Sequence, residues 1–352
     1  MKLRKDCQLA DRLVSELMAW KYSMMLVLSW GLAAGQVVLV PEGMRKQLEP
    51  VAAENPKLKL LFHGKGADAL SQIPEAEGYV GPLNDGILKA GTKLRWVHNF
   101  SAGVEGAVGL PGIRDGKVAL TNLKIHQGPE IADHAFALLL GLTRNMTEYH
   151  KAQEKGEWIK SSRDGLTLTE LRGKTMLVIG YGGIGTQVAE RARAFGMKVM
   201  AIDEKDIPLT VTVDRFGKPD ELDEMLPLAD VIVSCVPITP ATEKMIGEAQ
   251  FAKMKKGVYL INVSRGKVVD TEYLIKALQS GQVGAAGLDV VDPEPLPAES
   301  PLWKMPNVII TPHIAGVSDA RGGRSDELIL ENIERFSKGL PLKNVVDASK
   351  GY

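Results

Sequence analysis

Short runs of aliphatic residues alternate with amphipathic segments along most of the chain. In its first part the runs predict five short strands, at Val37–Val40, Leu58–Phe62, Tyr79–Val80, Leu94–Val97 and Val118–Leu120. From residue 175 a more regular series predicts six strands, at Met176–Ile179, Val199–Ile202, Val231–Val236, Val258–Val263, Ala285–Val290 and Val308–Ile310. Continuous aliphatic strands that alternate with helices are typical of a parallel sheet covered on both faces.

Helical periodicity is found in four segments, Pro129–Met146, Ile184–Phe195, Thr271–Gln279 and Asp319–Lys338. The first has proline in its first turn, and the third is ended by Gly281. The last is expected to return to the first part of the chain. The polar stretch Glu148–Arg172 is expected to be a connection between core elements.

Length and composition set further limits. The 352 residues suffice for two domains, and 43 basic against 43 acidic side chains give a formal net charge of zero. A chain without basic surplus does not have the electrostatic character of a nucleic-acid-binding protein. Two cysteines exclude a disulfide scaffold and a four-cysteine zinc site, and no His/Cys cluster has metal-ligand spacing.

The amino-terminal segment, residues 1–36, is expected to be a leader or extension. Its eleven-residue apolar run, Met24–Ala34, is too short to span a bilayer but resembles the apolar core of a secretory signal. The long stretch before the run contains acidic residues, which favours an over-extended start over export. We therefore expect a cytoplasmic protein, with export as the alternative.

A glycine motif follows the first strand of the second series. Residues 180–185, GYGGIG, match G-x-G-x-x-G between the strand Met176–Ile179 and the helix Ile184–Phe195. Such glycines permit a tight turn and let backbone N–H groups approach a pyrophosphate at the helix amino terminus. The motif predicts that Tyr181, Gly182, Gly183 and Ile184 bind a dinucleotide.

An acidic residue, Asp203, ends the next strand, eighteen residues beyond Gly185. A carboxylate there accepts hydrogen bonds from the adenosine ribose and repels a 2′-phosphate. The residues after it are Glu204 and Lys205, without an arginine, so the sequence favours NAD over NADP.

Three residues with acid–base or anion-binding side chains follow three successive strands. They are Arg265, Glu294 and His313. The carboxyl ends of parallel strands share one edge of a sheet, where such folds bind ligands. The imidazole of His313 is suited to exchange a proton with a substrate hydroxyl, because imidazole ordinarily titrates near neutral pH. Glu294 would orient the imidazole ring. Arg265 would hold a substrate carboxylate and polarise the neighbouring carbonyl.

Four ordered segments carry a resemblance to a known family: GYGGIG (180–185), NVSRGKVVD (262–270), LDVVDPEPL (288–296) and TPHIAG (311–316). From residue 37 to about 345 the chain resembles the NAD-dependent, D-isomer-specific 2-hydroxyacid dehydrogenases. In that family the arginine, glutamate and histidine of these segments form the catalytic trio. The resemblance therefore gives those roles to Arg265, Glu294 and His313, as the residues themselves do.

The resemblance also implies an architecture and further site residues. It implies two doubly wound parallel-sheet domains: a Rossmann NAD-binding domain, residues 127–317, inserted into a flavodoxin-like substrate domain, residues 37–126 and 318–352. Asp289 would hold the nicotinamide carboxamide, and Cys235, Pro237 and Thr242 would line the adenine side; Val263 and Ala315 complete the expected cofactor set. Substrate would be bound by Gly81 and the loop Phe100, Ser101, Ala102 and Gly103, which closure would bring toward His313.

The resemblance leaves alternatives open. Glu105 and Asp133 stand where the family usually has aspartate and glutamate, which leaves the subfamily undecided. An NAD-sensing, non-catalytic regulator is the alternative from another class, while glutamate at 294 argues against a formate dehydrogenase. The expected partners are a small 2-keto or 2-hydroxy acid and a second copy of the chain. The other five histidines, His63, His98, His126, His134 and His150, are expected to be surface or structural residues.

Overall fold

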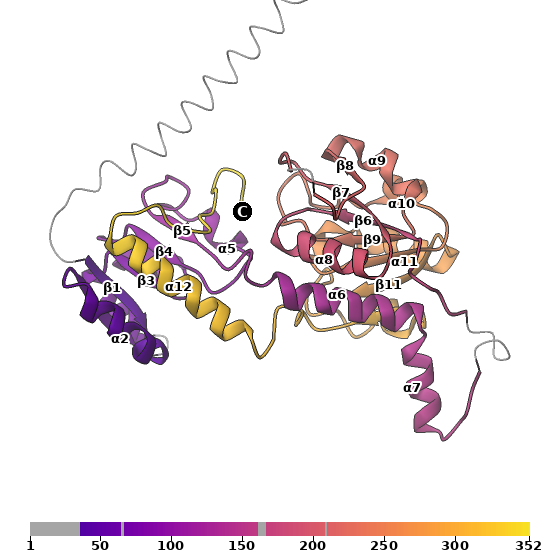
Figure 1. Ribbon diagram of the computed structural model, residues 1–352, viewed down its shortest axis with the longest axis horizontal. Coiled ribbons are helices and arrows are strands. Elements are labelled where there is room, and N and C mark those ends of the chain that lie inside the picture. The colour runs from indigo at the N-terminus through magenta and orange to yellow at the C-terminus, as the bar shows by residue number, and fades with distance from the viewer. Residues whose placement is uncertain (1–35, 65–66, 161–166, 208–209) are drawn as a thin grey trace, which may run out of the picture. The chain divides into compact units, whose positions relative to one another are not determined.

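The computed structural model describes residues 36–64, 67–160, 167–207 and 210–352 (Figure 1). The chain divides into two compact units, which are described separately. The first contains the described residues up to Phe100 together with Gly106–Asn122 and Ser325–Ala348. The second contains Ser101–Glu105, Leu123–Arg324 and Ser349–Tyr352. The apolar run Met24–Ala34 lies outside the described residues.

The first unit is built on a parallel sheet of five strands in the order β2-β1-β3-β4-β5. The strands are β1 (Gln36–Pro41), β2 (Leu58–His63), β3 (Gly78–Val80), β4 (Trp96–His98) and β5 (Ala119–Thr121). This is the strand order of flavodoxin-like sheets, as predicted. The helices that begin in this part of the chain are α2 (Arg45–Glu54), α3 (Ala67–Gln72), α4 (Asp85–Ala90) and α5 (Glu105–Val108).

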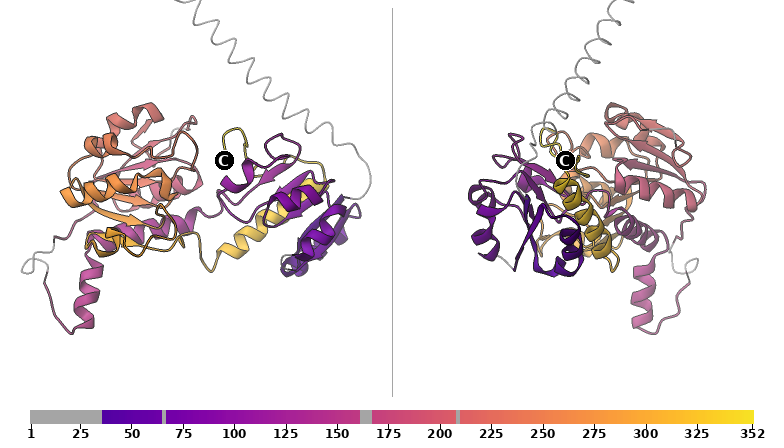
Figure 2. Two further views of the ribbon diagram at one scale, coloured as in Figure 1. Left: turned by 180° about the vertical axis from the view of Figure 1, so that it is seen from behind. Right: turned by 60° about the vertical axis from the view of Figure 1, so that its left-hand side comes forward.

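The last helix, α12 (Arg321–Ser337), supplies part of the core of the first unit. Its buried residues Ile329, Ile333 and Phe336 share a cluster with the side chains of β1 and with Trp96, whose ring centroid lies 5.1 Å from that of Phe336. The views of Figure 2 show α12 lying along this sheet. The amphipathic pattern of Asp319–Lys338 therefore predicted both the helix and its return to the first part of the chain.

The second unit is built on a seven-stranded parallel sheet in the order β12-β11-β10-β9-β6-β7-β8. Its strands are β6 (Thr175–Ile179), β7 (Lys198–Ile202), β8 (Arg215–Gly217), β9 (Val231–Ser234), β10 (Val258–Asn262), β11 (Val283–Leu288) and β12 (Val308–Ile310). The strand order reverses beside β6, as in the Rossmann fold. The prediction of two doubly wound parallel sheets is confirmed.

Helices cover both faces of this sheet. They are α6 (Gly128–Thr143), α8 (Gly183–Ala194), α9 (Leu222–Met225), α10 (Glu248–Lys253) and α11 (Thr271–Ser280), with α7 (Met146–Glu154) following α6. Met176 and Val178 of β6 pack with residues of α6 and α8, whereas Leu177 and Ile179 pack in a second cluster with α9, α10 and α11. Alternate side chains of one strand are thus buried on opposite faces, which explains the unbroken aliphatic runs.

Two expectations about local structure were wrong. The helix expected to reach Met146 ends at Thr143; Asn145 takes a left-handed conformation, with φ 52°, and α7 begins behind it. Part of the stretch expected to be a connection, Glu148–Arg172, is therefore helical. The sequence did not predict this helix because Ala152 is its one buried residue. The strand β8 was missed, since Arg215–Gly217 is three residues long at the edge of the sheet.

No helix among the described residues has the length and apolar character needed to cross a membrane.

Candidate active site

The glycine motif forms the turn between β6 and α8. Gly180 has φ 92°, a conformation that favours glycine, and a Cβ there would lie 2.9 Å from the carbonyl of Cys235. A Cβ on Gly185 would collide with the carbonyl oxygen of Gly180, so this glycine lets the helix pack closely on the strand. A Cβ on Gly182 would meet no atom within 4 Å, and α8 begins at the next residue. The turn therefore keeps open space beside a helix amino terminus, which fits a dinucleotide pyrophosphate.

Asp203 follows β7 and lies beside this turn. Its Oδ2 accepts a hydrogen bond from the backbone N–H of Tyr181 (2.8 Å), and its Oδ1 accepts one from Lys205 N (2.9 Å). Each oxygen retains a lone pair, so the carboxylate is held in place and can still accept ribose hydroxyls. The next residue, Glu204, accepts hydrogen bonds from the Tyr352 hydroxyl and the Lys350 ammonium, and these contacts lower the pKa of its carboxyl.

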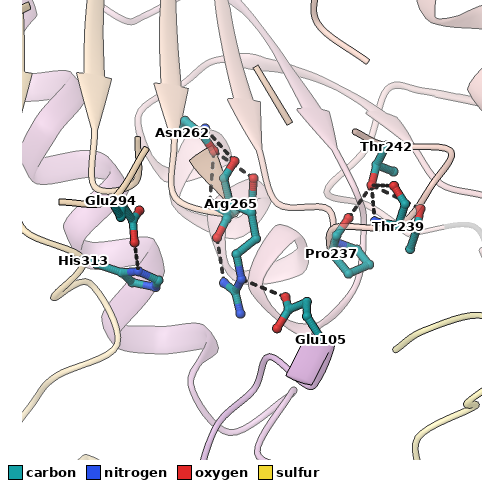
Figure 3. A network of polar contacts seen from close by, with 9 residues as sticks. Glu105, Pro237, Thr239, Thr242, Asn262, Arg265, Glu294 and His313 are labelled. Atoms are coloured by element: carbon teal, nitrogen blue, oxygen red, sulfur yellow. Dashed lines mark hydrogen bonds and ion pairs between the residues drawn. The ribbon is translucent and has the colours of Figure 1, made fainter. Parts of the chain in front are cut away.

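Arg265 lies in the turn after β10 and is held by buried polar groups. Asn262 donates from its side chain to the carbonyl oxygen of Arg265 (3.0 Å), while its Oδ1 accepts from both the backbone and the hydroxyl of Ser264. The Ser264 hydroxyl in turn contacts Ser234 at the end of β9 (2.8 Å). A Cβ on Gly266 would collide with the backbone of Val291, so this turn also needs a glycine. These contacts fix the backbone from which the guanidinium extends (Figure 3).

The guanidinium of Arg265 has an acidic partner from another part of the second unit. Its Nε donates to Glu105 Oε1 (2.8 Å), and its Nη1 donates to the Ser264 carbonyl oxygen (2.7 Å). A Cβ on Gly103 would collide with Arg265 Nη2, so the loop Ser101–Glu105 comes close to the guanidinium only because this residue is glycine. The structure thus places two of the predicted site residues, Gly103 and Arg265, side by side.

His313 and Glu294 are paired after β12 and β11. His313 Nδ1 lies 2.9 Å from Glu294 Oε2, and Glu294 Oε1 accepts from the backbone N–H of Val291 (3.0 Å). Because a carboxylate only accepts, Nδ1 carries the hydrogen and Nε2 is the ring nitrogen left for a ligand. About half of the His313 side chain (48%) is exposed. Figure 3 shows Arg265 and the His313–Glu294 pair at the same end of neighbouring strands.

Other predicted cofactor residues lie close to this edge, with several buried. Tyr181, Val263, Asp289 and Ala315 are almost fully buried, and the Tyr181 hydroxyl contacts Thr212 (2.7 Å). These four side chains therefore pack around the turns and expose little surface to a ligand. Gly183 also packs closely, since a Cβ there would lie 2.8 Å from Ile125 Cα.

The predicted adenine-side residues follow β9. Thr242 donates from its hydroxyl to the Pro237 carbonyl oxygen (2.7 Å) and accepts from Thr239 N (2.8 Å), which closes the loop drawn in Figure 3. Burial raises the pKa of the Cys235 thiol to about 12. At neutral pH this cysteine is thus a thiol and not a thiolate nucleophile.

Two predicted substrate residues, Gly81 and Phe100, belong to the first unit, whereas Ser101 and Ala102 belong to the second unit with Gly103. The Gly81 N–H donates to the His98 carbonyl oxygen (3.0 Å), and a Cβ on Gly81 would collide with the Tyr79 hydroxyl. Phe100 packs against the apolar core around Trp96.

Three residues that support the site were not predicted. Asn262 holds the Arg265 turn. The sequence feature that could have revealed this role is its position three residues before Arg265 in the segment 262–270. Glu105 pairs with Arg265 and was noted only for its difference from the family's aspartate. Thr311 binds the buried Asp289 beneath the loop of His313 (2.7 Å), and its signal was its place in the segment TPHIAG.

An open glycine turn, a carboxylate beside it with acceptor positions left over, and a paired imidazole are the features expected of a dinucleotide-binding dehydrogenase. Residues 136–315 match the family profile described as "D-isomer specific 2-hydroxyacid dehydrogenase, NAD binding domain". The chain belongs to the D-isomer specific 2-hydroxyacid dehydrogenase family. The predicted enzyme class is confirmed, and membership favours the catalytic oxidoreductase over the NAD-sensing regulator.

Named relatives agree with this assignment. The chain is 34% identical over 270 residues to a glyoxylate reductase of Korarchaeum cryptofilum, covering 76% of this chain and 80% of that protein. It is 32% identical over 316 residues to a glyoxylate/hydroxypyruvate reductase B of Yersinia enterocolitica, covering 88% and 95%. A solved D-isomer specific 2-hydroxyacid dehydrogenase of Xanthobacter autotrophicus, in complex with NADPH and MES, has a TM-score of 0.75 at 28% identity and covers 91% of this chain and 100% of its own.

The open space at Gly182 generates a prediction. Gly182→Ala should leave the melting temperature unchanged, because its Cβ meets no protein atom, but should weaken NADH binding about tenfold or more, since a side chain there blocks close approach of the pyrophosphate. Protein fluorescence quenching by NADH measures the affinity. Gly323→Ala, another position where a Cβ meets no atom, is the control and should bind NADH normally. Equal affinities in both variants would contradict this role of the turn.

Proposed function

We propose that this protein reduces a small 2-keto acid to the D-2-hydroxy acid, and catalyses the reverse reaction, with Arg265, Glu294 and His313 as catalytic residues. The observation that carries these roles is the hydrogen-bonded His313–Glu294 pair at the same sheet edge as the Arg265 turn. Relatives named for glyoxylate and hydroxypyruvate support keto acids of two or three carbons as substrates.

His313 acts as the general acid and base in this proposal. Its Nδ1–H is bound to Glu294, so Nε2 is available to give a proton to the carbonyl oxygen of the keto acid. The Glu294 carboxylate stabilises the imidazolium and fixes the ring plane. In the reverse direction the neutral Nε2 accepts the hydroxyl proton. In both directions Nδ1 stays protonated and Nε2 exchanges the proton, and the contact with Glu294 selects this arrangement.

Arg265 binds and polarises the substrate. Its Nε and Nη1 already donate to Glu105 and Ser264, which leaves Nη2, on the side of Gly103, as the nitrogen of the fork nearest the substrate loop. A guanidinium so held presents fixed donors to a carboxylate and to the neighbouring carbonyl oxygen. Backbone groups of Ser101, Ala102 and Gly103 are proposed to complete the carboxylate site.

The cofactor is proposed to be held by the glycine turn and the carboxylate beside it, which are Tyr181, Gly182, Gly183, Ile184 and Asp203. The residues proposed to lie beside the cofactor are Cys235, Pro237, Thr242, Val263, Asp289 and Ala315. When bound, NADH supplies the hydride that reduces the substrate carbonyl carbon. Free nicotinamide dinucleotides are a cytoplasmic pool, and we place the enzyme in the cytoplasm.

His313→Ala tests the central role in this proposal. The variant should lower kcat for glyoxylate or hydroxypyruvate reduction by roughly 10²- to 10⁴-fold, the usual contribution of a positioned general acid–base. Arg265→Ala should instead raise KM for the keto acid most strongly, because the carboxylate loses its clamp. NADH oxidation followed at 340 nm over a panel of 2-keto acids measures both.

His150→Ala is the matched control, because His150 is largely exposed on α7 and should be replaceable without effect on kcat. Near-normal turnover by His313→Ala would remove this residue from the mechanism, and an unchanged KM in Arg265→Ala would remove the clamp.

We also propose that NADH is preferred over NADPH, in contrast to the NADPH bound in the Xanthobacter autotrophicus structure. Asp203 faces the glycine turn with two held oxygens, and a like charge brought against it costs several kcal/mol. Asp203→Asn keeps a similar shape without the charge and should reduce the ratio of kcat/KM for NADH over NADPH by about tenfold or more. Asp220→Ser removes an exposed charge of the same unit and should not change the ratio. A wild-type preference for NADPH would refute this assignment.

A homodimer is the proposed assembly. The segment that contains α7 exposes Met146 and Trp158, the latter 91% exposed, and α7 extends away from the sheet of its unit (Figure 1). In this proposal the exposed apolar side chains of the projecting segment form the contact with the second copy. Trp158→Asp should convert the dimer to a monomer in size-exclusion chromatography with light scattering. Val211→Asp, an equally exposed position, should leave the mass unchanged; a wild-type monomer would contradict the assembly.

A further inference from the structure

The loop that carries His313 is held from below by one buried carboxylate. Asp289, 3% exposed, accepts hydrogen bonds on Oδ1 from the Thr311 hydroxyl (2.7 Å) and from Ile314 N (3.0 Å). Its Oδ2 accepts from Ala315 N (3.0 Å). A buried carboxylate is stable only with such partners, so these bonds form with the fold and persist in it.

The Thr311 hydroxyl links this carboxylate to a histidine. Because Thr311 gives its only proton to Asp289, its oxygen must accept in the 2.8 Å contact with His134 Nε2. His134 therefore carries a hydrogen on Nε2, and the same nitrogen lies 3.5 Å from Asp289 Oδ1. The three side chains form one ordered relay of donors, from His134 through Thr311 to Asp289.

His134 anchors this relay in a packed helix. It lies on α6, which packs against β10, β11 and β12, and its side chain is only 20% exposed. The neighbours Ala132, Ala135 and Leu138 are buried in the core of the unit. The relay thus ties the loop of His313 to a helix that is packed against three strands of the second unit.

The loop needs such a tie because His313 has an unfavourable backbone conformation. Its φ is 53°, in the left-handed region that non-glycine residues rarely adopt and that persists only where the surroundings enforce it. Its N–H donates to the carbonyl oxygen of Asp289 (2.8 Å), and residues on both sides of it are bound to the Asp289 carboxylate. The direction of the imidazole toward Glu294 depends on this backbone.

We propose that His134 and Thr311 are positioning residues that, through Asp289, hold His313 in the geometry required for proton transfer. The inference rests on the proposed function of His313 and extends it to two residues that touch neither Glu294 nor Arg265 in any contact described above. Asp289 then has a second role besides the proposed binding of the nicotinamide carboxamide, because its carboxylate accepts three hydrogen bonds from groups of the loop.

The test compares Thr311→Val, which keeps the shape and removes the hydroxyl, with Thr311→Ser, which keeps the hydroxyl. Thr311→Val should lower kcat by about 10- to 100-fold, because small misplacements of a reacting group have effects of this size. KM for the keto acid, the NADH dissociation constant and the melting temperature should change little, and Thr311→Ser should restore kcat. His134→Gln, whose amide can still donate, and His134→Leu, which cannot, form a second pair if Thr311→Val does not fold.

A readout without turnover separates this inference from the proposed function. In protein labelled with ¹⁵N-histidine, the ring signals of His313, assigned through His313→Gln, should shift in Thr311→Val and His134→Leu but not in Thr311→Ser. If the wild type reduces no 2-keto acid and these shifts occur, the proposed function fails and the positioning role stands. If kcat and the His313 signals are unchanged in Thr311→Val and His134→Leu, the positioning role is refuted. A parallel loss of stability, NADH binding and kcat would likewise refute it, because that pattern marks a purely structural contact.

Discussion

All seven strands of the second unit run in the same direction, and the site depends on this constraint. The ends of β6, β7, β10, β11 and β12 carry in turn the glycine turn, Asp203, Arg265, the Glu294 segment and His313. Residues as far apart as 180 and 313 thereby reach one edge of a sheet without any long-range pairing of their own. The strands stabilise the fold by being buried, and the candidate site residues are the first residues after each strand.

Parallel strands alone do not give those first residues a fixed conformation; polar side chains near the strand ends do. Asp203 holds the glycine turn through Tyr181 N, Asn262 holds the Arg265 turn, and Asp289 holds the His313 loop. In each case a side chain at the end of one strand accepts from, or donates to, the backbone of a loop beside it. Asn262 and Asp289 are buried, and a buried polar group without a partner is costly, so folding of the core enforces the geometry of their two loops.

Much of this was predictable from the sequence because the signals were local. The aliphatic runs predict strands that are buried on both faces. Arg265, Glu294 and His313 could be picked out because each follows one of these runs. The helix α7 and the strand β8 could not be predicted, because neither buries a periodic apolar face. His134 was expected to be structural; its contact with Thr311 joins residues 177 positions apart, which no local pattern reveals. Glu105 is likewise separated from Arg265 by 160 positions.

The residues that we propose set the cofactor preference therefore lie in loops and not in the sheets. The fold resembles that of an enzyme solved with NADPH, yet in the proposed function cofactor choice depends on the charge of the short segment after β7, where Asp203 and Glu204 both carry carboxylates. Glu204 is already paired with Lys350 and Tyr352, whereas the hydrogen bonds described for the Asp203 carboxylate come from backbone N–H groups and not from a cation. In the proposed function, a single carboxylate beside an open glycine turn therefore provides the selectivity, and the packing of the sheet takes no part in it.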